Sequence, residues 1–386
     1  MVNSAAGLSF EKEISREALD LHYSSFVADA HCDTLSRCTP RNIDFGRNLP
    51  AGHIDLRKLK SGGVNLQVFA AFVHPSQRYR GFFEPVNRML DKLEGTAARY
   101  PDQLSLVRNA DDLKRLRENG RIGAVAAIEG LHLIEGRVDN LRHFYRRGVR
   151  VVTLTWNNSN EYAVSSLDDA MRGVRGGLTD RGVDIIKEMN SLGITIDLSH
   201  CASDTLRDAL RVSSTPPLVS HSCCRHISDI FRNLSDEEIR AVADARGVIG
   251  VNYYPMFLEN EYQRMYFELW EERNAKYRKI NTRFGYRSAE AKRRKKQLQS
   301  ELEDKLPKVP YTRIVDHMEH IINTGGEDAV GLGSDFDGIP DTPLGFENVS
   351  KLPLLTQEML RRGWSEKRIR KILGENMLRL FSSILK

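Results

Sequence analysis

Residues 26–34 read FVADAHCDT, an apolar run that ends in a histidine and an aspartate. Seven further stretches repeat this form, in which a short β-branched or apolar run ends in polar or small residues and precedes a helix-like stretch. They are VNLQVFAAFV (64–73), GAVAAIEG (123–130), VRVVTLTW (149–156), ITIDLSH (194–200), PLVSHS (217–222), GVIGVNYY (247–254) and AVGLGSDFDG (329–338). Eight strands that alternate with helices predict a closed parallel (β/α)8 barrel, the TIM barrel.

The segments between these strands carry helix signals. Thr179 precedes an apolar pattern of helical spacing that ends at Gly193. Ser235 begins a second such segment and has Glu238 three residues later, which is a capping-box spacing. Both segments therefore fit the crossover helices of a barrel.

Two regions lie outside the repeat. Residues 1–25 predict a helix that leads into the first strand. Residues 258–308 predict one or two long charged helices inserted before the eighth strand. We therefore expect residues 1–386 to form a single barrel domain that contains this helical insert.

Composition is that of a soluble globular protein, with 40% hydrophobic and 28% charged residues. The chain lacks a run of ~18 apolar residues, a basic then apolar N-terminal signal, and a lipid-anchor signal at its C-terminal FSSILK. Its five cysteines form no CxxC pair, which favours reduced thiols. We expect a cytoplasmic protein with no membrane span or lipid anchor.

The net charge of +5 arises in one segment, because residues 261–310 hold 14 Lys and Arg against 8 Asp and Glu. Mixed-charge helices are usually solvated faces, so we expect no nucleic-acid partner. The KRRKK run at 292–296 leaves open a non-catalytic protein that docks on an anionic surface. Retention of metal together with loss of hydrolysis would favour that alternative.

Metal-capable side chains recur at the ends of the predicted strands. His31 and Asp33 are two residues apart, so both point to one face, at the barrel end where active sites form. One His-x-Asp pair alone is more often a local hydrogen bond. Four further candidates change this interpretation, each at the end of a strand: Glu129, His200, His221 and Asp335.

Three histidines and three carboxylates exceed the ligands of one four-coordinate zinc ion. Mixed imidazole and carboxylate ligands suit zinc, and two ions that share a bridging carboxylate account for the surplus. Such a pair generates hydroxide near neutral pH and polarises a carbonyl. The residues therefore predict two Zn²⁺ per chain.

Ten segments together make nearly the whole chain resemble the membrane (renal) dipeptidase family of zinc metallopeptidases, a branch of the amidohydrolase-like barrels. They are DAHCDT, GGVNLQVFAAFV, AIEG, LTW, GLTDRG, IDLSH, VSHS, RNLSDEEI, GLGSDFDG and GENMLRLF. The resemblance implies hydrolysis of free dipeptides, including those with a C-terminal D-residue, by a hydroxide that bridges the two metals. It also implies a homodimer.

Carried over by motif position, the resemblance assigns the metal ligands. His31 and Asp33 would bind one zinc ion. His200 and His221 would bind the other, and Glu129 would bridge the two.

The same resemblance implies that Asp335 is the acid/base group and that Arg232, eleven residues after His221, binds the substrate carboxylate. The sequence departs from the vertebrate pattern after the fourth strand, where Trp156 stands in place of a histidine that polarises the substrate carbonyl. Trp156 and Tyr254 are candidates for the substrate pocket, with plain packing as the alternative for both.

One rival activity is another amidohydrolase reaction on a small amide or lactone. Such relatives usually begin with His-x-His and carry a modified lysine bridge. Asp33 and Glu129 argue against that activity.

Overall fold

A computed structural model of the protein describes residues 14–286 and 288–386, and its centre is a closed barrel of parallel strands. From β3 to β9 each strand pairs with the next, β9 pairs with β1, β1 pairs with β2, and β2 pairs with β4, which closes the barrel. The barrel strands are β1 (Val27–Cys32), β2 (Val64–Ala71), β4 (Ile122–Glu129), β5 (Val149–Thr153), β6 (Thr195–Asp197), β7 (Leu218–Ser222), β8 (Val248–Val251) and β9 (Val330–Leu332). These are the eight runs of the sequence, so the predicted TIM barrel is confirmed.

A short additional strand, β3 (Leu104–Leu106), pairs in parallel with the first residues of β4. The sequence did not predict it. Three residues are too few for an alternation of apolar and polar side chains to be recognised.

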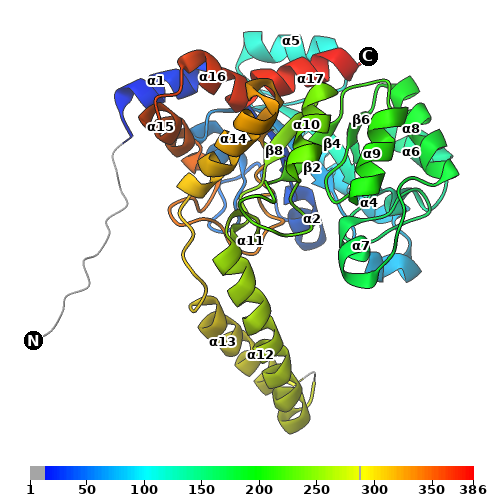
Figure 1. Ribbon diagram of the computed structural model, residues 1–386, viewed down its shortest axis with the longest axis vertical. Coiled ribbons are helices and arrows are strands. Elements are labelled where there is room, and N and C mark those ends of the chain that lie inside the picture. The colour runs from blue at the N-terminus through cyan, green and yellow to red at the C-terminus, as the bar shows by residue number, and fades with distance from the viewer. Residues whose placement is uncertain (1–13, 287) are drawn as a thin grey trace, which may run out of the picture.

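Helices surround the barrel (Figure 1). They are α1 (Arg16–Ser24), α2 (Thr34–Cys38), α3 (Leu56–Ser61), α4 (Phe83–Arg99), α5 (Ala110–Asn119), α6 (Val138–Arg146), α7 (Ser166–Arg172), α8 (Asp180–Leu192), α9 (Ser203–Val212), α10 (Asp236–Asp244), α11 (Pro255–Leu258), α14 (Thr312–Gly325), α15 (Pro353–Arg361), α16 (Glu366–Arg370) and α17 (Asn376–Ile384).

The predicted caps form as the sequence indicates. Thr179 accepts a hydrogen bond from the amide of Gly182 at the start of α8, and Ser235 and Glu238 form a capping box on α10. The helix predicted over residues 1–25 is α1, which begins at Arg16; residues 1–13 of that prediction lie outside the described residues.

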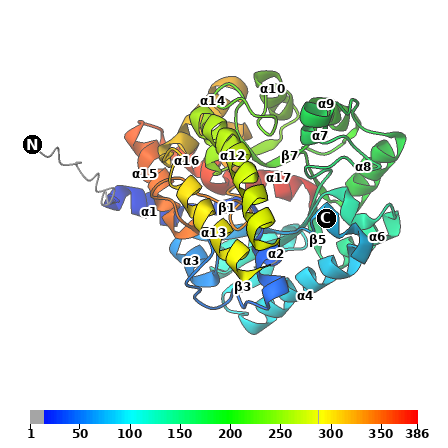
Figure 2. The ribbon, with the colours of Figure 1, turned by 90° about the horizontal axis from the view of Figure 1, so that it is seen from below.

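The charged insert forms α12 (Asn260–Phe284) and α13 (Ala289–Glu303), between β8 and β9. The two helices contact each other and project from the rest of the molecule at the side where α11 lies (Figure 1). Viewed from below, they stand in front of the barrel strands (Figure 2). Within residues 14–286 and 288–386, no helix is long and apolar enough to span a membrane.

The C-terminal helix closes one end of the barrel. Met377, Leu380 and Phe381 of α17 pack against strand residues such as Ala28 and Val248, and all are buried. This seal covers the end where the strands begin. The opposite end, where the strands finish, is left for the site.

A buried histidine holds the segment that follows β7 against α14. His317 Nδ1 accepts a hydrogen bond from the Cys224 amide at 3.1 Å, and its Nε2 faces the Leu258 carbonyl at 3.2 Å. Both contacts require the neutral ring with its proton on Nε2. Burial lowers the pKa of His317 to about 4.

We expect His317 to make the protein less stable in mild acid. Its folded-state pKa is below the value near 6.5 of an unfolded chain. Its contribution is therefore complete above pH ~6.5 and is lost as the pH falls toward 4, up to about 3 kcal/mol. His317→Gln keeps a donor and an acceptor but does not titrate. The melting-temperature gap between wild type and His317→Gln should narrow from pH 7 to pH 5.

A gap between wild type and His317→Gln that stays constant across this range would contradict the assignment.

Candidate metal centre and substrate pocket

The strand ends bring all six predicted metal-capable residues to one place. Their positions are His31 in β1, Asp33 at the N-cap of α2, Glu129 at the last residue of β4, His200 three residues after β6, His221 in β7 and Asp335 three residues after β9. All but Asp335 are buried, and Asp335 is nearly so. They form three groups of residues whose ligand atoms lie within 4.8 Å of one another, and Asp197 is the one other member of these groups.

Glu129 lies between the two halves of this cluster. Its Oε1 is 3.0 Å from His200 Nε2 and 3.7 Å from His221 Nε2. Its Oε2 faces the other side, 4.0 Å from His31 Nε2. One carboxylate thus presents an oxygen to each half, as a bridging ligand would.

The protonation of His200 and His221 follows from their outer contacts. His200 Nδ1 is 2.9 Å from Asn157 Oδ1, an acceptor. His221 Nδ1 is 2.7 Å from Ser220 Oγ, whose own proton is donated to Asp197. Each ring therefore has its proton on Nδ1 and a lone pair on Nε2. The two Nε2 atoms are 3.0 Å apart, so two lone pairs and a carboxylate oxygen converge on one point.

On the other side of Glu129, two buried polar atoms have no hydrogen-bond partner among the described residues. His31 Nε2 and Asp33 Oδ1 make no hydrogen bond. Asp33 Oδ2 and Asp335 Oδ1 lie 3.4 and 4.0 Å from His31 Nε2. Unpaired buried polar atoms are costly, so a cation that all of them could ligate fits this position. Nitrogen and oxygen donors of this kind suit a transition metal ion.

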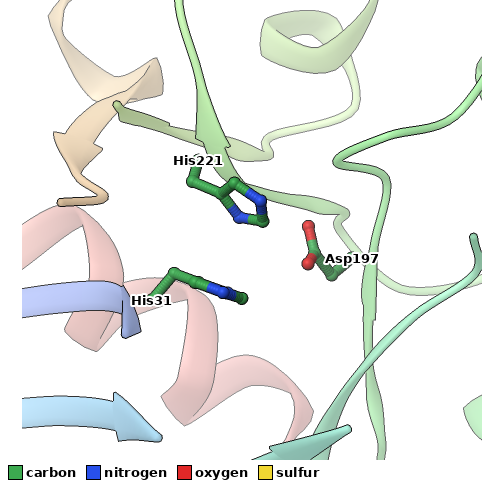
Figure 3. A group of neighbouring side chains, drawn as sticks. All are labelled: His31, Asp197 and His221. Carbon is green, nitrogen blue, oxygen red and sulfur yellow. The ribbon is translucent and has the colours of Figure 1, made fainter. Parts of the chain in front are cut away.

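Asp197 is a supporting residue that sequence reasoning missed. It approaches His31 and His221 closely enough to form a candidate metal group with them (Figure 3). However, its carboxylate already accepts hydrogen bonds from Thr153, Ser220 and the Ser199 amide. Asp197 therefore fixes Ser220, and through it the ring of His221, in the manner of an outer-shell partner. Its place in IDLSH, three residues before His200, was the available signal.

The pKa values show how unfavourable this cluster is when only protein groups are present. Burial and the Asp33 charge raise the pKa of Glu129 well above its usual range. Burial lowers the pKa of His200 and His221.

Two further groups are shifted. Burial raises the pKa of Asp335 to about 7. Burial alone would lower the pKa of His31, but Asp33 and Glu129 raise it to about 10. Crowded carboxylates of this kind are typical of functional sites.

The backbone near the site takes conformations that most residues avoid. His200 and Asp335 have left-handed φ angles of 65° and 59°. At Gly338, an added Cβ would lie 2.2 Å from Asp33 Oδ2 and 2.6 Å from Asp335 Oδ1. Only glycine lets this loop pass so close to the two carboxylates.

A pocket of about 850 Å³ opens over the cluster and reaches Asp33, Glu129, His200 and Asp335. Arg232, Trp156 and Tyr254, which the sequence predicts to bind substrate together with Asp335, also line it. This size is within the range of small-molecule sites.

Arg232 is 5% exposed, and burial lowers its pKa. Its guanidinium donates to the His221 carbonyl at 3.2 Å and approaches Ser222 Oγ at 3.5 Å. Among the described residues, no carboxylate lies within 4.0 Å of it in an ion pair. A buried guanidinium that faces a pocket without an acidic partner suits a substrate carboxylate.

Comparisons with known proteins agree with this geometry. The family model described as membrane dipeptidase (peptidase family M19) matches residues 15–386. An uncharacterized dipeptidase of Schizosaccharomyces pombe is 31% identical over 96% of this chain and 83% of its own length.

Two solved structures share the fold. The probable dipeptidase PvdM of Pseudomonas aeruginosa has a TM-score of 0.79 at 22% identity, covering 97% of this chain and 99% of its own. A metallopeptidase of Rhodobacter sphaeroides, liganded with a phosphinate mimic of L-Ala-D-Ala, has a TM-score of 0.75 at 24% identity, covering 93% and 99%. With the family model matched over nearly its whole length, the chain belongs to the membrane dipeptidase family, peptidase family M19, and is a metallo-dipeptidase.

Proposed function

We propose that this metallo-dipeptidase uses two zinc ions that share Glu129. His31 and Asp33 would hold one ion, and His200 and His221 the other. The observation that supports this most directly is the orientation of Glu129, whose two oxygens face opposite halves of the cluster. Imidazole and carboxylate donors are the usual ligands of catalytic zinc.

Bound metal ions of this kind activate water near neutral pH and polarise a carbonyl oxygen. The protein groups supply the rest of the chemistry. Asp335 lies beside His31, and Asn252 Nδ2 donates to its Oδ2 at 3.0 Å, which orients the carboxylate. The Asp335 carboxylate would accept a proton from the attacking water and then release it to the leaving amine.

Arg232 gives the site its preference for free dipeptides. Its guanidinium would bind the terminal carboxylate of the substrate in the buried part of the pocket. A longer peptide would place an uncharged amide at that position and leave the guanidinium without a partner.

Trp156 does not take the chemical role of the histidine that stands at this position in the vertebrate pattern. Its ring packs 4.8 Å from Phe72 and 6.2 Å from His200, measured between ring centroids. We assign it to the pocket wall beside His200.

The Rhodobacter metallopeptidase of the same fold was solved with a mimic of L-Ala-D-Ala. We extend acceptance of a C-terminal D-residue to this chain as part of the proposal. Arg232 would recognise the carboxylate of the substrate, so it would not select the configuration of the adjacent carbon.

Metal content tests the ligand assignment. Purified wild type should hold close to two zinc ions per chain, and His200→Ala should hold about one, because only one half of the cluster loses a nitrogen ligand. Elemental analysis gives the ratio. His143→Ala, on the outer helix α6, is the matched histidine control and should keep the wild-type content. Equal zinc content in wild type and His200→Ala would refute the assignment.

Asp335→Asn separates acid/base chemistry from metal binding. The amide keeps the shape of the side chain but does not exchange protons. We expect kcat to fall by roughly a hundredfold or more, while zinc content stays at the wild-type value. A large loss of zinc would instead identify Asp335 as a ligand.

Arg232→Lys should raise KM for free dipeptides and leave zinc content unchanged, because lysine keeps the charge but loses the two-pronged geometry. Arg232→Ala should lower kcat/KM by roughly ten- to a hundredfold. A dipeptide amide, which lacks the carboxylate, should be a poor substrate of the wild type, and the substitutions should add little further loss. Equal damage on acid and amide would show that Arg232 is structural.

A further inference from the structure

The insert contributes to the wall of the active-site pocket. Tyr266 and Phe267 of α12 line the same pocket as Glu129, although the rest of α12 and α13 projects away from the barrel (Figure 1). The substrate pocket therefore includes a segment outside the repeating strands and helices of the barrel.

Aromatic rings form a continuous chain from the inner part of the pocket to its mouth. The Arg232 guanidinium carbon lies 5.4 Å from the centroid of Phe257, and Phe257 is 5.3 Å from Tyr254. Tyr254 is 6.3 Å from Tyr262, which stacks on Tyr266 at 6.5 Å.

Phe267 completes the chain, 6.0 Å from Tyr266. We call these five residues, Tyr254, Phe257, Tyr262, Tyr266 and Phe267, the aromatic wall. Four of them line the pocket itself, and Tyr262 packs behind them as a buried residue.

The mouth of the pocket is apolar on two sides. Phe267 is 40% exposed, and Met171 of α7, which also lines the pocket, is 65% exposed. Both side chains therefore leave apolar surface at the rim of the pocket, where it is available to a substrate side chain. Helices from distant parts of the chain supply these two side chains.

The charged side chains near the aromatic wall do not favour a charged substrate side chain next to it. Arg37 also lines the pocket, but its guanidinium is 3.7 Å from the buried Asp337 carboxylate. Arg232 contacts the wall at its inner end, and behind the wall the Asp341 carboxylate accepts a hydrogen bond from the Tyr262 hydroxyl at 3.0 Å. If Arg232 binds the substrate carboxylate, the side chain on the adjacent carbon lies next to Phe257 and the rings beyond it.

We propose that the aromatic wall binds the side chain of the C-terminal residue of the dipeptide, so that this enzyme prefers a large apolar residue at that position. This inference rests on the proposed function, because it takes Arg232 as the carboxylate-binding group. The insert helix α12 is then a specificity element of the active site.

The test compares two pairs of dipeptides with the zinc-loaded enzyme. L-Ala-L-Phe and L-Ala-Gly vary the C-terminal residue, and L-Phe-L-Ala and L-Ala-L-Ala vary the N-terminal one. Wild type should show kcat/KM at least about tenfold higher for L-Ala-L-Phe than for L-Ala-Gly, as apolar pockets discriminate by such factors. Phe267→Ala should reduce that ratio by about fivefold, since its ring is partly exposed.

Trp270→Ala is the matched control. Trp270 lies on the same helix and is 46% exposed, and it lines a second cavity against α13 that includes Tyr262 and Tyr266 but not Phe267. It should keep the wild-type ratio for L-Ala-L-Phe over L-Ala-Gly. Equal effects of the two substitutions would overturn the proposal.

Two other outcomes would also overturn it. One is hydrolysis of all four dipeptides with no preference for C-terminal Phe. The other is a Phe267→Ala effect confined to L-Phe-L-Ala, which would assign the wall to the N-terminal side chain. Neither affects the proposed function, whereas a wild type that hydrolyses none of the four would overturn the proposed function itself.

Discussion

The convergence of lone pairs from His200, His221 and Glu129 is the constraint on which the site depends. Two imidazole lone pairs and one carboxylate oxygen meet within 3.0–3.7 Å, in a place that is almost fully buried. Without a cation this arrangement of buried groups is unfavourable, and the raised pKa of Glu129 reflects that cost. A bound cation makes these contacts favourable, because each lone pair then becomes a ligand of the ion.

The remainder of the fold serves to hold those atoms in position. Parallel strands bring residues that are far apart in the sequence to one rim, while α17 seals the other end of the barrel. Asp197, Ser220 and Asn157 then fix the rings of His200 and His221. The left-handed φ angles of His200 and Asp335 indicate that the surrounding structure holds these two residues in conformations that they would otherwise avoid.

Much of this was predictable from the sequence, since eight strands that alternate with helices favour a parallel barrel, and several of them end in metal-capable residues. His31 and Asp33 share a face because a strand has a period of two, and His200 and His221 each end a separate apolar run. The supporting contacts were harder to predict. Asn157 resembles an ordinary polar loop residue, and the hydrogen-bond partners of Asp197, which lies in the IDLSH run, depend on how the strands are placed. The short strand β3 carries no pattern at all.

The insert is a second case in which the sequence does not predict contacts that depend on tertiary packing. Its charge pattern predicts solvated helices, and most of α12 and α13 is indeed solvated. That Tyr266 and Phe267 reach the pocket depends on the direction in which the chain leaves α11, which follows from tertiary packing. An aromatic pair in a charged helix carries no such information in the sequence.

Anomalous diffraction from crystals of the zinc-loaded protein, recorded above and below the zinc absorption edge, tests the central claim most directly. The account predicts two zinc peaks on opposite sides of Glu129, one near His31 and Asp33 and the other near His200 and His221. A single peak, or two peaks that do not share Glu129, would contradict it.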